Sequence, residues 1–272
     1  MKKAVSIILK GRNEGETVVK VMSIAGSDSF SGAGIQADLK TFRLFGVYGF
    51  TVITSVTSQN TKAVKDIFNI PPDIVASQIE AILEDSRVSG VKIGMIGDEL
   101  STDVIGEKIE NHGLINIVLD PVIFSHSGTI FLQKKHLSKV KKELIPLSDI
   151  VTPNISEAEI LTGRKISDLK GAKDAALAIC EMGADSVLIK GGHANYGKID
   201  LLLTGGDFHE FDNEDVATLP VHGTGCILSS AIVCGIASGE NTFDSCRNAI
   251  DFVHDSIKNA LKIGSDQRIA PI

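Results

Sequence analysis

Short runs of β-branched and apolar residues alternate along the chain with longer amphipathic segments. The runs predict strands over residues 18–25, 50–56, 91–94, 115–120, 150–152 and 186–191. Between them, apolar residues recur every three or four positions, as on one face of a helix, at Ile35, Leu39 and Phe42, at Ile74, Ile79, Ile82 and Leu83, and across 172–182. This alternation indicates a largely parallel sheet with helices on both faces.

The last third of the chain has a different pattern. Residues 198–203 and 207–211 flank the tripeptide Thr204-Gly205-Gly206, which is a hairpin signal. Two helices are expected after it, near 223–238 and 242–261. The predicted fold class is therefore α/β, with antiparallel strands at one edge of the sheet.

No Pro- or Ser-rich linker divides the chain, and its length suits one core. We expect a single domain over residues 18–272. Residues 1–17 fit the strand and helix scheme poorly and are treated as an N-terminal extension of uncertain structure. In one interpretation residues 5–9 pair with 18–23 across a polar turn, and in the other the segment is a loose extension.

Composition excludes several classes of function. The formal net charge is −7, from 27 Lys and Arg against 34 Asp and Glu, without a cluster of basic residues. Binding to nucleic acid or to an anionic membrane is therefore not expected. No stretch approaches the roughly 18 apolar residues of a membrane span, so a cytoplasmic protein is expected. The four cysteines lack metal-binding spacing, which favours free thiols over disulfides or zinc.

Ligands of parallel α/β sheets bind beyond the carboxyl ends of the strands, and two early strand ends carry unusual residues. Residues 25–34 are rich in small residues and include Gly26 and the carboxylate of Asp28. Residues 57–61 place Gln59 among polar side chains that could contact a heterocycle. The alternatives are that the glycines only allow tight packing and that the polar residues only satisfy a turn.

Two later strand ends carry oxygen ligands that suit Mg²⁺. Asp120 follows one strand, and Asn154 and Glu157 follow the next. Asn154 and Glu157 also have the spacing of a helix capping box, in which each side chain accepts a hydrogen bond from the backbone of the other. Residue spacing alone does not separate the two interpretations.

The segment from His222 to Ala231 places glycines immediately before an apolar helix. The first turn of such a helix has free N–H groups and the positive end of the helix dipole, which suit the anionic oxygens of a phosphoryl group. Cys226 lies in this turn, where a lowered thiol pKa is expected. The alternative is a buried cysteine in a close-packed turn. Cys180, Cys234 and Cys246 lie in helical stripes and are expected to be core thiols.

Taken in order, these motifs resemble the ribokinase-like superfamily and, within it, the hydroxymethylpyrimidine/phosphomethylpyrimidine kinases of thiamine biosynthesis. The resemblance covers residues 20–260, with the segments Ala25-Gly26-Ser27-Asp28, 34–42, Gln59-Asn60-Thr61, Lys92-Ile93-Gly94-Met95, Asp120-Pro121-Val122, Thr152-Pro153-Asn154, Lys190-Gly191-Gly192-His193 and 222–226. It implies a three-layer α/β/α fold with a mostly parallel central sheet.

The resemblance also implies an activity. ATP, with Mg²⁺, would phosphorylate the hydroxymethyl group of 4-amino-5-hydroxymethyl-2-methylpyrimidine and then the resulting monophosphate. The expected partners are this small substrate and a second copy of the chain in a homodimer. The alternatives are a pyridoxine or pyridoxal kinase, which has the same fold, and a non-catalytic regulator that binds the pyrimidine.

Residue roles follow from the same resemblance. Cys226 is the expected base, and Gly223, Thr224 and Gly225 are expected to form an anion hole around the transferred group. The pyrimidine pocket is expected to contain Gly26, Asp28, Gln59, Met95 and Val122; Gln59 is able to donate to a ring nitrogen and accept from the amino group. The expected nucleotide contacts are Lys190, Asn154 and Thr224. The expected metal ligands are Asp120 and Glu157.

Overall fold

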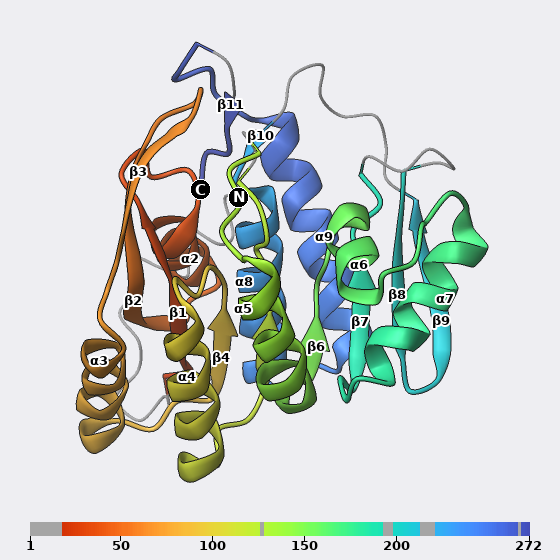
Figure 1. Ribbon diagram of the computed structural model, residues 1–272. Helices are drawn as coiled ribbons and strands as arrows, with labels where there is room; N and C mark the ends of the chain where they lie inside the picture. The colour runs from red at the N-terminus through yellow and green to blue at the C-terminus, as the bar shows by residue number, and fades with distance from the viewer. Residues whose placement is uncertain (1–17, 126–127, 193–197, 213–220, 266–267) are drawn as a thin grey trace.

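The computed structural model describes residues 18–125, 128–192, 198–212, 221–265 and 268–272 (Figure 1). The expected N-terminal extension, residues 1–17, lies outside them. In the described part, nine strands form one sheet in the order β3-β2-β1-β4-β5-β6-β7-β8-β9. The strands are β1 (Lys20–Asp28), β2 (Tyr48–Gln59), β3 (Val64–Asn69), β4 (Gly90–Ile93), β5 (Ile117–Leu119), β6 (Ile150–Val151), β7 (Ser186–Ile189), β8 (Ile199–Thr204) and β9 (Asp207–Asp212).

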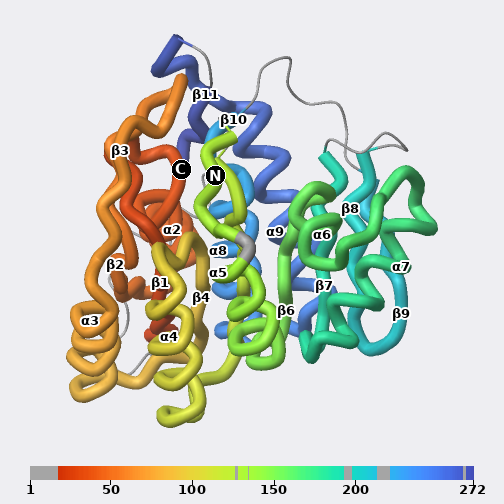
Figure 2. Tube along the Cα trace, in the orientation of Figure 1, coloured from red at the N-terminus to blue at the C-terminus, as the bar shows by residue number. Residues whose placement is uncertain are grey.

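The six strands from β2 to β7 in this order pair in parallel, and the two edges are antiparallel. At one edge β3 pairs with β2, and at the other β8 pairs with both β7 and β9 (Figure 2). The β8–β9 hairpin turns at Gly205 and Gly206, both with positive φ. The predicted α/β class and the antiparallel edge hairpin are therefore confirmed.

Helices cover both faces of the sheet (Figure 1). The described helices are α2 (Gly34–Leu44), α3 (Pro72–Asp85), α4 (Glu99–His112), α5 (Lys134–Lys139), α6 (Ile155–Thr162), α7 (Leu169–Cys180), α8 (Thr224–Ala237) and α9 (Thr242–Lys258). A π-helical turn (Val140–Leu144) and a 3-10 turn (Ile145–Leu147) follow α5, and two short strands, β10 (Val221–His222) and β11 (Arg268–Ile269), pair with each other. No helix among the described residues has the length and apolarity to cross a membrane.

The central strands place alternate side chains in two separate cores. On β4, Val91 and Ile93 pack into the core beneath α3, α4 and α7, whereas on β5 Val118 packs into the core beneath α2, α8 and α9. Such strands are buried on both faces, which explains why they are visible in the sequence as continuous apolar runs.

Some predicted details were wrong. The strand predicted at 50–56 continues as β2 to Gln59, because residues 55–59 pair with β3, which was not predicted. Helix α4 was also not predicted. Leu39 and Ile74 were placed on apolar helical stripes, and both are exposed to solvent.

Candidate functional site

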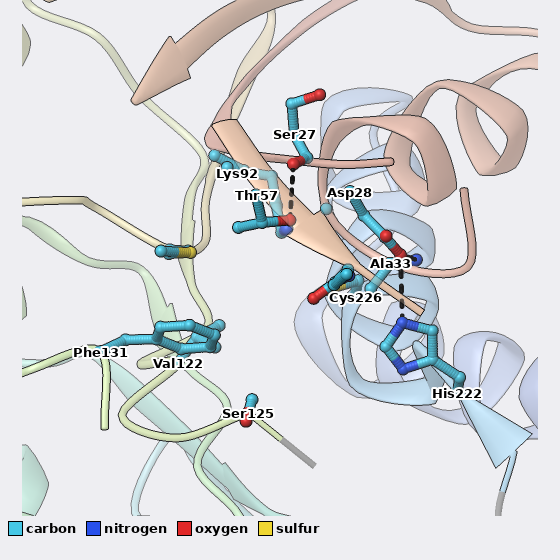
Figure 3. Close-up of a pocket in the computed structure, with 15 residues that line it drawn as sticks. Ser27, Asp28, Ala33, Thr57, Lys92, Val122, Ser125, Phe131, His222 and Cys226 are labelled. Atoms are coloured by element: carbon cyan, nitrogen blue, oxygen red, sulfur yellow. Dashed lines mark hydrogen bonds and ion pairs between the residues drawn. The ribbon is translucent and has the colours of Figure 1, made fainter. Parts of the chain in front are cut away.

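A pocket lies at the carboxyl ends of the central strands, beside the start of α8 (Figure 3). Its lining comes from the ends of β1 and β2, from residues after β4 and β5, and from the first turn of α8. It contains all five residues predicted for the pyrimidine pocket, together with Cys226. The lining residues are Ala25, Gly26, Ser27, Asp28, Ala33, Gly34, Thr57, Gln59, Lys92, Met95, Val122, Ser125, Phe131, His222 and Cys226.

Asp28 organises the loop that follows β1. Its carboxylate accepts hydrogen bonds from the backbone N–H groups of Phe30, Gly32 and Ala33 and lies 3.0 Å from Nε2 of His222 (Figure 3). Burial by itself would raise the pKa of Asp28, but hydrogen bonds from the His222 and Gln59 side chains lower it overall. The carboxylate is thus engaged by the protein and fixes the loop and the Gln59 side chain.

Small residues make room on the opposite wall of the pocket. A Cβ atom at Gly26 would lie 2.9 Å from Sδ of Met95, so a larger residue there would displace the methionine. Val122 and Phe131 add apolar surface to the lining (Figure 3). The pocket therefore combines an apolar wall with the polar groups of Gln59 and Thr57, as a heterocycle would require.

Cys226 has a raised pKa rather than the lowered one that the helix position predicts. Burial raises the pKa of the thiol to about 11, against the opposing effects of the Lys92 ammonium and of a hydrogen bond from the backbone of Gly34. The prediction of a lowered pKa was wrong because the loss of solvation outweighs the helix dipole at this position. At neutral pH the unliganded site therefore holds a thiol.

The first turn of α8 is open. Its N-cap is Gly223, with φ +82°, and no side chain caps it within the described residues. A Cβ at Gly223 would lie 1.8 Å from the carbonyl oxygen of Gly32, so glycine is required both for backbone conformation and for space. The first intrahelical hydrogen bond runs from the N–H of Ile227 to the carbonyl oxygen of Gly223. The N–H groups of Thr224, Gly225 and Cys226 come before it and have no intrahelical acceptor, and such groups bind anions.

A charged cluster lies next to this turn. Nζ of Lys190 is 2.9 Å from Oδ1 of Asp120 and 3.9 Å from Oε2 of Glu157. A Cβ at Gly225 would lie 3.3 Å from Nζ of Lys190 and 3.6 Å from Oδ2 of Asp120. The predicted anion hole and the predicted phosphate and metal residues are thus brought together around the start of α8.

Asn154 and Glu157 form the capping box of α6. Oδ1 of Asn154 accepts from the N–H of Glu157 at 2.9 Å, and Oε2 of Glu157 accepts from the N–H of Asn154 at 2.8 Å. Burial raises the pKa of Glu157 to about 7, with Lys190 opposing the rise and Asp120 adding to it. The capping interpretation is confirmed, and the same carboxylate also faces Lys190.

Asp120 and Glu157 fit a hard divalent cation. Both carboxylates are almost fully buried; burial is the main cause of the raised pKa of Glu157, and the smaller contribution from repulsion by Asp120 would be relieved by a cation between the two groups. Mg²⁺ is commonly held by one or two carboxylates, with water and substrate phosphates completing its shell. No cluster of three or more metal-ligating side chains occurs in the described part of the chain.

Sequence reasoning missed several lining residues. Lys92 and its partner Asp38 belong to the segments that carry the family resemblance, but no role was predicted for them. A lysine inside an otherwise apolar strand is unusual, and this was visible in the sequence. Ser125 and Phe131 lie in a loop, and no sequence signal would have found them.

A pocket beside the open start of α8, with a lysine at the end of a neighbouring strand, is the arrangement expected from the resemblance to the ribokinase-like small-molecule kinases. The comparisons agree. The family model described as phosphomethylpyrimidine kinase matches residues 28–271. The hydroxymethylpyrimidine/phosphomethylpyrimidine kinase of Aquifex aeolicus is 42% identical over 250 residues, covering 91% of this chain and 98% of the relative.

Solved structures give the same result. The phosphomethylpyrimidine kinase of Clostridium difficile 630 superposes with a TM-score of 0.80 at 38% identity, covering 88% of this chain and 100% of that one. The Staphylococcus aureus pyridoxal kinase in complex with AMP-PCP and pyridoxal has a TM-score of 0.85 at 30% identity, with 93% of each chain covered. The fold is shared by both groups, while sequence identity is higher with the first. The chain belongs to the phosphomethylpyrimidine kinase family.

Proposed function

We propose that this chain transfers the γ-phosphoryl group of ATP to the hydroxymethyl group of 4-amino-5-hydroxymethyl-2-methylpyrimidine, and then a second group to the monophosphate. The observation that carries the proposal is that the pocket lined by Cys226 adjoins the charged cluster of Lys190 and Asp120. Cys226 lines the acceptor pocket and lies in the same helical turn as Gly225, where an added Cβ would lie 3.3 Å from Nζ of Lys190 and 3.6 Å from Oδ2 of Asp120. Acceptor and phosphate donor would therefore meet at the start of α8.

In the proposed complex the pyrimidine lies against Met95, Val122 and Gly26. The hydrogen bond from Gln59 to Asp28 orients the amide, so its oxygen is left to accept from the amino group of the substrate. An amide that the wrong ring covers without pairing is costly, and this makes Gln59 the proposed determinant of specificity.

We assign the phosphate groups to the open turn of α8 and to Lys190. The N–H groups of Thr224 and Gly225 face the transferred group, and Lys190 and Asn154 face the nucleotide. Charge spreads over the phosphoryl oxygens during transfer, so donors fixed in place before the reaction lower its barrier. Mg²⁺ held by Asp120 and Glu157 would neutralise phosphate charge in that complex.

Cys226 is the proposed acceptor of the substrate hydroxyl proton. Its thiolate, when formed, is a strong base, since the pKa of the thiol is about 11. Transfer of this kind depends chiefly on positioning and electrostatics, which the pocket and the α8 turn supply.

The test is a phosphoryl-transfer assay with ATP and Mg²⁺ on the hydroxymethylpyrimidine, its monophosphate and pyridoxine. We expect both pyrimidines to be phosphorylated. Cys226→Ala should abolish turnover, and Gln59→Ala should raise KM for the pyrimidines. Cys234→Ala, a buried thiol of the same helix, is the matched control and should retain activity. Binding of the pyrimidine without turnover in the wild type would overturn the proposal.

Pyridoxine or pyridoxal phosphorylation is the second candidate. It is favoured by the structural similarity to the pyridoxal kinase from S. aureus, whose structure contains AMP-PCP and pyridoxal. A higher kcat/KM for pyridoxine than for the pyrimidine would assign the chain to that activity.

We further propose that residues 18–272 form a single kinase domain and that two copies associate through the β2–β3 edge. The edge exposes apolar side chains, with Val56 45%, Ile67 39% and Phe68 67% accessible to solvent. Sedimentation analysis should show a dimer, and Phe68→Lys should shift it to a monomer. A wild-type monomer at micromolar concentration would refute the association.

A further inference from the structure

A charged side chain lies inside the central sheet, in the lining of the pocket that contains Cys226. Lys92, on β4, has no solvent-exposed surface, and its Nζ donates to both carboxylate oxygens of Asp38 at 3.0 Å. Strands buried on both faces are normally apolar, and a lysine is almost never fully buried unless it is paired. The position therefore calls for an explanation beyond burial.

The ion pair is fixed by four different elements. Asp38 comes from α2 and also accepts hydrogen bonds from Ser23 Oγ on β1, at 2.5 Å, and from Ser230 Oγ on α8, at 2.8 Å. Replacing a buried ion pair with apolar residues is often neutral or stabilising, so stability does not account for this one.

Lys92 is also aimed at the site. It lines the pocket, and a Cβ atom at Gly94 would lie 2.7 Å from its Nζ, so this glycine leaves room for the ammonium. Among the charged groups that act on the Cys226 thiol, Lys92 favours the thiolate, whereas Asp38 and Asp120 disfavour it. Lys190 interacts with the thiol as well, but Asp120 is its nearest charged partner.

We propose that Lys92 is a positioning residue for the phosphoryl transfer, whose ammonium, clamped by Asp38, supplies the positive charge that holds Cys226 ready to accept the substrate proton. This inference rests on the proposed role of Cys226 as base. In the step concerned, the thiol of Cys226 first releases its own proton to solvent, and the hydroxyl proton then passes to the resulting Sγ thiolate. The hydroxyl oxygen forms a bond to the γ-phosphorus, and the bond from that phosphorus to ADP breaks.

The test measures the thiol directly. Full-length protein is treated with iodoacetamide between pH 7 and 10, and alkylation is followed by mass spectrometry of the peptide that contains Cys226. Lys92→Met should slow alkylation about tenfold at a given pH, because an opposite charge is lost beside the thiolate. It also leaves Asp38 unpaired, so the double variant Lys92→Met/Asp38→Asn, which removes both charges, is measured beside it.

The double variant should still be alkylated more slowly than the wild type, since Lys92 affects the thiol more than Asp38 does. In the kinase assay both variants should lose kcat, with the pH profile shifted to higher pH and KM for the acceptor unchanged. Val91→Ala is the matched control. Val91 precedes Lys92 on β4 and packs into the core on the other face of the sheet. The smaller side chain should lower stability but leave the alkylation of Cys226 at the wild-type rate.

Two outcomes would overturn the inference in distinguishable ways. If Cys226→Ala retains turnover, the base assignment fails and this inference fails with it. If Cys226→Ala is inactive while both folded Lys92 variants are alkylated at the wild-type rate, only the role of Lys92 is refuted. The ion pair would then serve only to join β4 to α2.

Discussion

Helices α6 and α8 both begin at the site, but the first turn of α6 is capped by side chains and the first turn of α8 is not capped by any described side chain. At α6, Asn154 and Glu157 cap each other and satisfy two backbone N–H groups. At α8, the N-cap is Gly223 and no described side chain caps the turn. A cap contributes stability, whereas an open turn gives up that contribution and keeps its donors for an anion. The first turn of α6 thus stabilises the fold, and the first turn of α8 is the one that we propose binds the phosphate.

The two helix starts also differ in how closely they approach neighbouring backbone. The α8 turn approaches the loop after β1 so closely that Gly223 leaves no space for a Cβ beside the carbonyl of Gly32. The same approach lets the backbone of Gly34 donate to the thiol of Cys226. An open helix start therefore also holds the acceptor pocket and the phosphate site in contact.

The largest expected effect on activity comes from adding a side chain at Gly223, where the α8 turn approaches Gly32. Gly223→Ala should lower kcat/KM about hundredfold, comparable to the loss of one preorganised donor, because the turn must move away from Gly32. Gly239→Ala is the matched control: its φ is +93°, but nothing lies within 4 Å of the added Cβ. It should cost about 1–2 kcal/mol of stability and leave kcat/KM unchanged. Equal losses of activity in the two variants would contradict a specific role for the α8 turn.

The second prediction concerns pH and the capped terminus. The pKa of Glu157 is raised to about 7 in the folded chain, above its ordinary value of 4.5, so the folded state binds the extra proton. Stability from this group is fully present below about pH 4.5 and is lost as pH rises through 7. Urea denaturation of the metal-free protein between pH 4 and 8 should show the loss.

Glu157→Gln keeps an acceptor for the N–H of Asn154 but does not titrate, so the decline between pH 4.5 and 7 should become shallower. Glu159→Gln changes a carboxylate of the same helix whose pKa is lowered by hydrogen bonds from the backbone of Ile166 and from Lys165, so above about pH 5 it should keep the wild-type slope. An unchanged slope in Glu157→Gln would show that other groups cause the pH dependence.

Gly225→Ala should have a smaller effect than Gly223→Ala. Its Cβ would lie 3.3 Å from Nζ of Lys190, which is the mobile end of a side chain, so the lysine shifts rather than the backbone. We expect KM for ATP to rise about tenfold, the equivalent of about 1.4 kcal/mol. Steady-state kinetics at varied ATP would measure it, and an unchanged KM would indicate that the lysine does not contact the nucleotide.

The smallest expected effect is the loss of the α6 cap. Asn154→Ala should destabilise the chain by about 1 kcal/mol, and so should Asn241→Ala, because both side chains cap the start of a helix. Thermal unfolding should show similar losses. Only Asn154→Ala should also raise KM for ATP, and a rise in both would point to a general effect of stability.

The sequence alone located the strands of the parallel part of the sheet. The runs at 91–94, 150–152 and 186–191 coincide with β4, β6 and β7 to within two residues. Strands buried on both faces must be apolar throughout, so their composition reveals them. The β8–β9 hairpin was equally visible, because its turn needs two residues with positive φ and Gly205 and Gly206 supply them.

The antiparallel edge at β3 was not visible. β3 is exposed along its length and mixes Lys65 and Asp66 with Ile67 and Phe68. Nothing in that pattern indicates a strand, which forms because β2 offers it hydrogen-bonding partners. The same pairing turned Gln59 from an expected loop residue into the last residue of a strand.

For the site, the sequence alone supplied the candidate residues: the glycines before α8, Cys226, and the oxygen and lysine groups at strand ends. Their local motifs are short, so their chemistry is visible in the sequence. Only the tertiary structure decided how they act on one another. It brought Lys92 to Asp38, 54 residues away in the chain, and raised the pKa of Cys226 instead of lowering it. Solvation and long-range charge depend on what surrounds a group in space, and no local pattern of residues specifies those surroundings.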